Sequence, residues 1–306
     1  MKHVDRRALT LAMALYAAPL TAEAQVIGAP AGSGNFPAIA EARADAPGYT
    51  IYRPAQWPGE QLPLVLWGNG GCRNNRLSAS HLLREIASHG YLVIANGAPQ
   101  EERPVLASLP AANGPQPEGA MPRRATPDET QTSQMLAAIE WATKSDLANH
   151  VDVTRIAVMG HSCGGLQALA AGADPRIDTV VAFNSGVYVQ AGSGLSGVGI
   201  VKDDLNRLHT PVAYILGGPQ DIAYPNGSDD VQRIAHVPVF YANSPVGHGG
   251  TFGLANGGDY GRIGAAWLDW QLKGSKTAGA MFAGAECGLC KDKTWTIVRK
   301  QFPENP

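Results

Sequence analysis

The chain has 306 residues, of which 44% are hydrophobic and 16% are charged, so it can bury a large core and is neither a disordered nor a collagen-like polymer. Lys and Arg number 24 against 26 Asp and Glu, which gives a formal net charge of -2. Basic residues form no run longer than a pair, so neither nucleic acid nor an anionic membrane surface is an expected partner.

The first residues have the features of a secretory signal peptide. A basic start precedes a short apolar stretch, and Ala22-Glu23-Ala24 forms a cleavage site of the Ala-x-Ala type. We therefore expect residues 1–24 to be removed on export and the mature chain to be periplasmic or secreted. The apolar stretch is too short to cross a bilayer, and no later window has about 18 uninterrupted apolar residues, so no integral membrane association is expected.

Residues 25–306 alternate apolar runs with helix-like segments, a pattern typical of an α/β fold whose mostly parallel sheet is covered by helices on both faces. With no internal repeat and no change of composition, we predict a single domain that ends in a tail at about 276–306. The expected strands are residues 62–67, 91–95, 156–159, 179–184, 212–216 and 237–241. The expected helices are residues 80–88, 133–147, which could begin as early as Thr126, and 166–172.

Two long connections lack a helical or strand period. Residues 99–125 are rich in proline and glycine, and residues 186–199 are rich in glycine. Both follow the carboxyl end of an expected strand, where ligands bind in open α/β sheets. Each is expected either as a wall of a binding cleft or as a plain surface connection, and the pattern leaves both open.

The four cysteines allow three pairings in an oxidising compartment. Cys287 and Cys290 have the CxxC spacing, which favours a local structural disulfide. A redox pair would need a thioredoxin-like βαβ context, and a zinc site would need a second cysteine pair, so both are weaker alternatives.

The strongest chemical signal follows the expected strand at 156–159. There Gly160-His161-Ser162-Cys163-Gly164 has the form Gly-x-Ser-x-Gly and leads into a helix of small residues. In such a turn the glycines make room for an exposed nucleophilic serine, and the helix amides face a developing oxyanion. Five residues alone are a weak signal in a chain with 36 glycines, so the interpretation depends on the strand-turn-helix context.

A serine nucleophile requires a base and an orienting carboxylate, which follow this type of turn in the order Asp, His. Asp221 lies in the loop after the strand at 212–216, and His248 lies in a glycine-rich loop after the next strand. We predict that Ser162 attacks, His248 transfers the proton and Asp221 stabilises the imidazolium. The weaker candidates are Asp229 and Asp230 for the carboxylate and His161, His209 and His236 for the base.

The backbone N–H of Cys163 and one N–H from the loop after the strand at 62–67 are the expected donors of an oxyanion hole. In that loop, Gly70 or Gly71 would let the backbone approach a substrate carbonyl closely. A nucleotide-binding glycine loop is the rival interpretation, but the stretch lacks both the Rossmann glycine pattern and the P-loop lysine.

With Asn69-Gly70-Gly71, Gly160-His161-Ser162-Cys163-Gly164, Asp221 and His248 in this order, the chain resembles the α/β-hydrolase superfamily over about residues 48–275. Residues 88–95 and 247–250 are similar to those of secreted esterases of the dienelactone-hydrolase, chlorophyllase and cutinase-like polyester-hydrolase group. The resemblance implies a central, mostly parallel sheet, serine-esterase chemistry, and neither a metal nor an organic cofactor. It does not define the substrate, because this fold hosts many activities.

Two residues depart from the pattern of that group. Cys163 stands where such enzymes often carry glutamine or methionine, and Asn69 stands where many esterases have histidine. If both loops build one oxyanion hole, Cys72 and Cys163 lie close together. Either a disulfide that ties the two loops or a pair of packed free thiols is then expected.

We expect a serine carboxylic-ester hydrolase that acts through an acyl-enzyme on short-chain, aryl, carbohydrate-linked or polymeric esters. No long apolar insertion follows the strand at 179–184, so no large lid is predicted. The competing interpretations are a serine peptidase or amidase and a non-catalytic binding module on the same fold. The sequence leaves the oligomeric state open. Candidate substrate-stacking side chains, which core packing would explain equally well, are Trp67, Tyr188, Tyr224 and Phe252.

Overall fold

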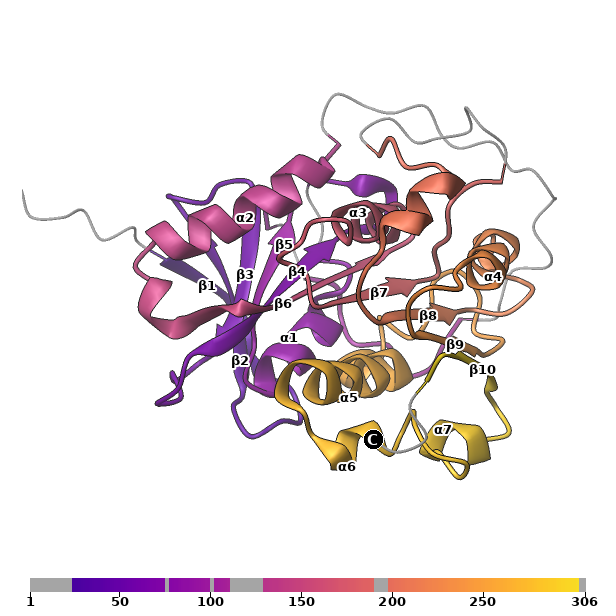
Figure 1. Ribbon diagram of the computed structural model, residues 1–306. Helices are drawn as coiled ribbons and strands as arrows, with labels where there is room; N and C mark the ends of the chain where they lie inside the picture. The colour runs from indigo at the N-terminus through magenta and orange to yellow at the C-terminus, as the bar shows by residue number, and fades with distance from the viewer. Residues whose placement is uncertain (1–23, 75–76, 100–101, 111–128, 190–197, 303–306) are drawn as a thin grey trace, which may run out of the picture.

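A mixed, mostly parallel sheet of ten strands runs through the protein, and helices cover both of its faces (Figure 1). The computed structural model describes residues 24–74, 77–99, 102–110, 129–189 and 198–302. The predicted α/β fold class is confirmed. The expected signal peptide lies outside the described residues except for Ala24. Within the described ranges, no helix combines the length and the apolar character that a membrane span requires.

The centre of the sheet is parallel, in the order β5-β4-β6-β7-β8-β9. Antiparallel strands extend it on both sides, β3, β2 and β1 beside β5 and β10 beside β9. The strands are β1 (Ala24–Ala31), β2 (Ala38–Arg43), β3 (Tyr49–Pro54), β4 (Leu62–Gly68), β5 (Leu92–Asn96), β6 (Val151–His161), β7 (Thr179–Phe183), β8 (Val212–Leu216), β9 (Val239–Asn243) and β10 (Thr296–Lys300).

The six strands predicted from apolar runs are the six parallel strands. In β4, Leu64 and Leu66 enter the core on one face of the sheet, whereas Val65 and Trp67 enter the core on the other. A strand that is buried on both faces is apolar throughout, which makes it visible in the sequence. The four antiparallel strands were not predicted, because they contain polar and small residues and form no continuous apolar run; β1, for instance, is largely exposed.

Helices α2, α3 and α4 cover one face of the sheet, and α1 and α5 cover the other (Figure 1). Helix α1 has the predicted bounds. Helix α2 begins at Thr132, one residue before the predicted start, and ends at Lys144 instead of residue 147. The alternative start at Thr126 is wrong, because Glu129 pairs with Arg73 in an isolated β-bridge. Residues 126–128 lie outside the described part. The helices are α1 (Ser80–Ser88), α2 (Thr132–Lys144), α3 (Cys163–Ala171), α4 (Tyr224–Arg233), α5 (Gly258–Lys273), α6 (Lys276–Gly279) and α7 (Gly288–Lys291), with 3-10 turns at Gly70–Cys72, Ala148–His150, Lys202–Arg207 and Ala255–Gly257.

The C-terminal tail packs against the sheet. A disulfide joins Cys287 to Cys290 at the start of α7, as the CxxC spacing predicts. Strand β10 then pairs antiparallel with β9, from Thr296 opposite Asn243 to Lys300 opposite Val239. The tail therefore covers the edge of β9 that the parallel sheet would otherwise leave open.

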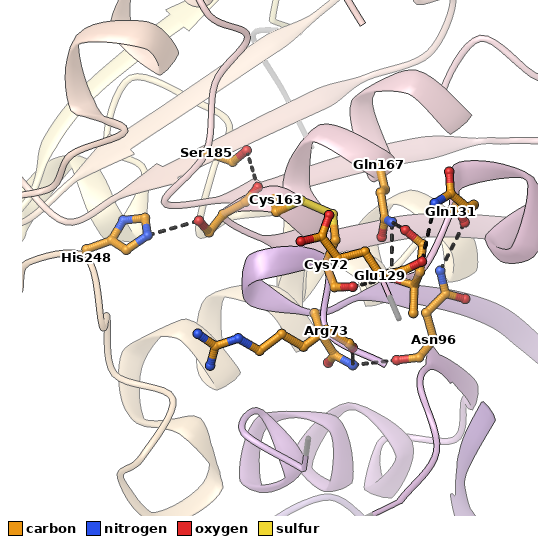
Figure 2. The surroundings of a disulfide bond; sticks show 12 residues. Cys72, Arg73, Asn96, Glu129, Gln131, Cys163, Gln167, Ser185 and His248 are labelled. Atoms are coloured by element: carbon orange, nitrogen blue, oxygen red, sulfur yellow. Dashed lines mark hydrogen bonds between the residues drawn. A yellow bond between two sulfur atoms is a disulfide. The ribbon is translucent and has the colours of Figure 1, made fainter. Parts of the chain in front are cut away.

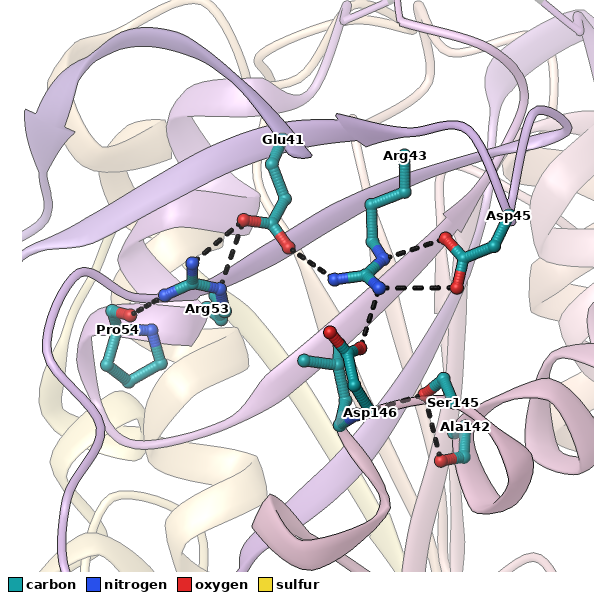
Figure 3. Close-up of polar contacts among 9 residues, drawn as sticks. Glu41, Arg43, Asp45, Arg53, Pro54, Ala142, Ser145 and Asp146 are labelled. Atoms are coloured by element: carbon teal, nitrogen blue, oxygen red, sulfur yellow. Dashed lines mark hydrogen bonds and ion pairs between the residues drawn. The ribbon is translucent and has the colours of Figure 1, made fainter. Parts of the chain in front are cut away.

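Buried charges join the antiparallel strands to the end of α2 (Figure 3). Glu41 on β2 is fully buried between two guanidinium groups, 2.9 Å from Arg53 and 3.7 Å from Arg43. Arg43 also donates to Asp146, 2.6 Å away, and to Asp45, 3.0 Å away. Because a buried charge is costly unless it is paired, this network defines how β2 and β3 sit against α2.

A histidine between two carboxylates joins α1 to α5. The Nδ1 of His89 lies 3.3 Å from Asp269 on α5, and its Nε2 lies 3.2 Å from Glu85 on α1. These hydrogen bonds raise the pKa of His89 to about 9, and the bond to Asp269 has the largest effect. The pKa of each carboxyl group, Glu85 and Asp269, is lowered in turn.

This arrangement predicts a stability that depends on pH. Protonation of His89 favours the folded state, so its contribution is complete below about pH 6.5, the pKa of an unfolded histidine, and is lost as the pH rises through about 9. Urea unfolding of wild type and His89→Gln should therefore give a difference in unfolding free energy that shrinks between pH 6 and 10. The exposed His209, changed to Gln, is the control; equal pH dependence in all three proteins would contradict the prediction.

Candidate active site

Four loops at the carboxyl edge of the parallel sheet bring the predicted site residues together. Gly70 follows β4, Ser162 follows β6, Asp221 follows β8 and His248 follows β9. Because these strands are parallel and near one another, residues that are far apart in the sequence meet at one edge.

Ser162 occupies a sharp turn between β6 and α3. Its backbone has φ 55° and ψ -120°, a conformation that is rare for a residue with a side chain. The turn is held by its N–H, which donates to the carbonyl of Phe183 at 3.0 Å, and by its carbonyl, which accepts from the Ser185 hydroxyl at 2.7 Å. The predicted glycines are required here, since a Cβ on Gly160 would lie 2.1 Å from the carbonyl oxygen of Gly164.

Ser162, His248 and Asp221 form a hydrogen-bonded row. The Nε2 of His248 lies 3.0 Å from the Ser162 Oγ, and its Nδ1 lies 2.6 Å from Asp221 Oδ1. Asp221 is only 1% exposed, and its carboxylate also accepts from the backbone N–H groups of Ala223 and Gly217 at 2.9 and 3.1 Å. The carboxylate is thus fixed on both oxygens, and it in turn orients the imidazole toward the serine.

The two weaker carboxylate candidates are engaged elsewhere. Asp230 accepts from Lys202 Nζ at 2.5 Å and from the backbone N–H of Val187 at 2.8 Å. Asp229 pairs with Lys202 at 2.7 Å and with Arg233 at 2.6 Å. Both therefore hold α4 and its surroundings in place, and neither contacts His248.

His161 supports the site without being its base. Its Nε2 donates to the carbonyl oxygen of His248 at 2.9 Å, and the two rings lie 5.1 Å apart. Burial and the nearby imidazole of His248 lower the pKa of His161 to about 4. His161 therefore stays neutral and holds the loop of His248. The histidines at 209 and 236 precede β8 and β9, so they lie at the opposite edge of the sheet and cannot act as the base.

Asn184 is a positioning residue that the sequence analysis missed. It directly follows β7 with φ 44°, and its Nδ2 donates to the carbonyls of Gly247 and His248 at 3.2 and 2.8 Å. Its Oδ1 accepts from the hydroxyl of Tyr260 at 2.7 Å. The sequence did offer a signal for this role. An asparagine tolerates a left-handed backbone, and this one stands immediately after a buried strand at the edge of the sheet where the site lies.

The loop after β4 is organised by Asn69, the residue that departs from the resembled family. Its Oδ1 accepts from the indole N–H of Trp67 at 3.0 Å, and its Nδ2 donates to the carbonyls of Arg73 and Asn96. The next residue, Gly70, packs so closely that a Cβ would lie 2.6 Å from His161 Nδ1. The asparagine is therefore the internal scaffold of this turn.

The first cysteine pair is also bonded. A disulfide joins Cys72 to Cys163, with their Cα atoms 5.2 Å apart, and it lies beside the hydrogen bond between His248 and the serine (Figure 2). Of the two expected alternatives, the disulfide is confirmed and the pair of packed free thiols is not, since all four cysteines are paired. Two disulfides are consistent with an oxidising compartment.

A pocket of about 770 Å³ opens at Ser162 and His248. In the predicted 99–125 loop, residues 99 and 102–110 are described. Residues within 102–110 line the pocket, and the N–H of Leu106 donates to the carbonyl of Gly253 at 2.8 Å. The described part of the 186–199 loop contributes no lining residue. The apolar lining includes Leu106, Leu109, Ile222, Val246 and Phe252, and the basic lining includes Arg73, His81 and Arg103.

Of the four aromatic side chains predicted to stack on a substrate, only Phe252 lines the described pocket. Trp67 is fully buried, and its ring centroid lies 5.9 Å from that of Phe252, so it supports the pocket from within the core. Tyr188 and Tyr224 pack against the core on the other face of the sheet. For these three residues, core packing is the role that their positions explain.

Comparison with known proteins gives no family assignment: no family model and no curated protein matches the chain. In the part of the chain that the structure describes, no group of three or more His, Cys, Asp or Glu side chains is arranged to hold a metal ion.

Proposed function

We propose that the protein is a serine carboxylic-ester hydrolase of the α/β-hydrolase type. The observation that carries the proposal is the hydrogen-bonded row of Ser162, His248 and Asp221 at the mouth of a partly apolar pocket. A serine hydroxyl becomes a useful nucleophile only beside a base, and a base works best when a third group orients it.

In the proposed reaction, the Ser162 Oγ bonds to the ester carbonyl carbon while His248 Nε2 takes the hydroxyl proton. The tetrahedral intermediate collapses, the bond to the alcohol oxygen breaks, and His248 returns the proton to that oxygen. Water then attacks the acyl-enzyme, again with His248 as base, and releases the acid and the free serine. The carboxylate of Asp221 stabilises the imidazolium of His248 both when the acyl-enzyme forms and when water hydrolyses it.

The negative charge on the carbonyl oxygen needs donors that are already in place. Cys163 is the first residue of α3, and the first amides of a helix have no partner within the helix. Gly70 and Gly71 line the pocket from the opposite loop. We assign the oxyanion hole to the N–H of Cys163 together with that of Gly70 or Gly71.

The substrate class follows from the lining of the pocket. The lining includes the apolar side chains Leu106, Leu109, Ile222, Val246 and Phe252, which favours a short acyl chain or an aryl group over a highly polar one. Esters of carbohydrate or polymeric alcohols fit the same chemistry, provided that the alcohol extends out of the pocket. The two disulfides and the expected signal peptide favour action in the periplasm or outside the cell.

Chromogenic esters of graded acyl length, hydrolysed by the mature protein and by Ser162→Ala, test the proposal. We expect the substitution to lower kcat by about 10⁴- to 10⁶-fold, since the covalent step is lost. Ser133→Ala, an exposed serine on α2, is the matched control and should leave the rate unchanged.

The competing functions have their own outcomes. Equal ester turnover in wild type and Ser162→Ala would reject the nucleophile. Amide turnover that exceeds ester turnover would favour a peptidase or amidase. Failure of a fluorophosphonate probe to label Ser162, together with no turnover of any ester, would favour a binding module.

A further inference from the structure

We propose that the disulfide between Cys72 and Cys163 is a positioning element of the active site, which holds the two halves of the oxyanion hole at their working separation. This inference rests on the proposed function. It also implies that the site is incomplete until the disulfide has formed, so that the enzyme acquires full activity only in an oxidising environment.

The position of the disulfide carries the proposal. Cys163 directly follows the nucleophile, and its own N–H is one assigned donor; Cys72 directly follows Gly70 and Gly71, the source of the other donor. The two cysteines are 91 residues apart in the sequence, and both are almost completely buried. The disulfide thus joins Cys163, whose N–H is one donor, to Cys72, the residue next to Gly71 (Figure 2).

The loop that carries Cys72 needs such a restraint, because its backbone is strained. Cys72 has φ 48°, a left-handed conformation that is unfavourable for a residue with a side chain, whereas Gly71 adopts its φ of 67° without strain because glycine has no Cβ. Such a conformation persists only where the surroundings hold it in place. Released from Cys163, the loop is expected to relax toward an ordinary conformation and to move the glycine amides.

Hydrogen bonds hold the same loop on its other side. The carbonyl of Cys72 accepts from the N–H and the hydroxyl of Thr130 at 2.8 and 3.1 Å, and Gln167 of α3 donates to the Thr130 carbonyl at 2.6 Å. These bonds connect Cys72 to α3 only through an intermediate residue. The disulfide joins Cys72 to α3 directly, and its other end, Cys163, is an assigned residue of the oxyanion hole.

The functional consequence follows from how an oxyanion hole works. Two donors stabilise the intermediate only when they converge on one oxygen, and the loss of one donor lowers kcat about 10²- to 10³-fold. A displacement of about 1 Å can already cost about 100-fold. Because the effect is specific to the transition state, it should lower kcat and leave KM nearly unchanged.

Formation of the disulfide is a balanced exchange. The two thiols of Cys72 and Cys163 lose two electrons and two protons, and a disulfide oxidant of the dithiol class is reduced to its dithiol. Before export the chain has both thiols reduced, so the proposal predicts a protein of low esterase activity in a reducing compartment.

The test compares two double variants. In Cys72→Ser/Cys163→Ser we expect kcat to fall about 30- to 1,000-fold, with KM within about threefold of wild type. In Cys287→Ser/Cys290→Ser, which removes the disulfide of the tail, both constants should stay within about twofold. Rates are expressed per site titrated with the fluorophosphonate, so that a smaller folded fraction does not count as a slower enzyme. A kcat per titrated site within threefold of wild type in the first variant would overturn the proposal.

A second arm covers the case in which the first variant does not fold. The Cys287→Ser/Cys290→Ser protein has only the disulfide of interest, and it can be reduced with a phosphine while circular dichroism reports the fold and mass spectrometry reports the free thiols. Activity that falls in step with the appearance of the two thiols, in protein that stays folded, would support the proposal. Full activity with the disulfide open would reject it.

Failure of the proposed role of the disulfide and failure of the proposed function give different results. If wild type hydrolyses esters and depends on Ser162 while the reduced protein is equally active, only the positioning role of the Cys72–Cys163 disulfide is rejected. If wild type neither hydrolyses an ester nor reacts with the fluorophosphonate, the proposed function is rejected, and the role of the disulfide is rejected with it.

Discussion

Asp221→Asn is expected to lower kcat for ester hydrolysis by about 10⁴-fold with little change in KM. The carboxylate accepts the Nδ1–H of His248 at 2.6 Å, which leaves Nε2 unprotonated and facing the serine 3.0 Å away. An amide can instead present its NH₂ group to Nδ1. The imidazole would then carry its proton on Nε2 and could not accept one from Ser162.

Neither orientation of the amide preserves all the hydrogen bonds of the carboxylate. Both oxygens of Asp221 already accept backbone N–H groups, from Gly217 on one oxygen and from Ala223 on the other. Only one of these bonds survives in an asparagine, whichever way the amide points. Some destabilisation is therefore expected beside the loss of activity, and a melting curve separates the two.

Asp229→Asn is the matched control, since Asp229 comes from the same segment and pairs with Lys202 and Arg233 instead of a histidine. Its kcat should stay within about twofold of wild type. A loss of less than tenfold in Asp221→Asn would mean that Asp221 does not orient the base.

Gly164→Ala is expected to lower both stability and activity severely. A Cβ at this position would lie 2.0 Å from the carbonyl carbon and oxygen of Gly68, the last residue of β4. These are backbone atoms at the carboxyl end of a central strand, so no side chain can move aside to make room. The first turn of α3 must shift away from β4, which displaces Ser162 and the oxyanion donors together.

Overpacking of a core lowers the free energy of unfolding by about 1–3 kcal/mol in ordinary cases. A collision with backbone atoms, which cannot move aside, is expected to reach or exceed the upper end of this range. For a protein of this size that corresponds to a fall in Tm of about 5 °C or more, with a loss of kcat of at least about 100-fold. Thermal melting and ester hydrolysis measure the two effects.

Gly59→Ala is the control, because nothing lies within 4 Å of the position that its Cβ would take. Its Tm and kcat should match those of wild type. A Tm for Gly164→Ala within about 2 °C of wild type would show that α3 can move away from β4 at little cost.

The amount of structure that the sequence predicts varies with how local each feature is. The strands of the parallel centre are buried on both faces, so each is an apolar run that can be recognised from its own residues. The turn around Ser162 is equally local, because two neighbouring glycines and a following helix of small residues define it. The antiparallel strands β1, β2, β3 and β10 have no such signature, since pairing with another strand is what makes them strands.

The candidate site also has features that the sequence predicts and features that it does not. Parallel strands place the loops that follow them at one edge, so the order Ser162, Asp221, His248 after three strands was enough to bring these residues to one place. The choice of Asp221 over Asp230 was not determined by the sequence. Both follow β8. Asp221 lies in a turn, and its Oδ1 is 2.6 Å from Nδ1 of His248. Asp230 lies on α4, and its Oδ1 is 2.5 Å from Nζ of Lys202.

Sequence alone thus determined the fold class, the parallel core, the turn around Ser162 and the set of residues from which the hydrogen-bonded row of Ser162, His248 and Asp221 is formed. Only the tertiary structure decided the pairing of Cys72 with Cys163, the support that Asn184 and His161 give to the loop of His248, and the burial of Trp67 below the pocket. The physical reason is the range of the interactions. Periodic burial and turn chemistry act between neighbours in the chain, whereas a disulfide, a hydrogen bond to a distant carbonyl and a cavity each require segments that only folding brings together.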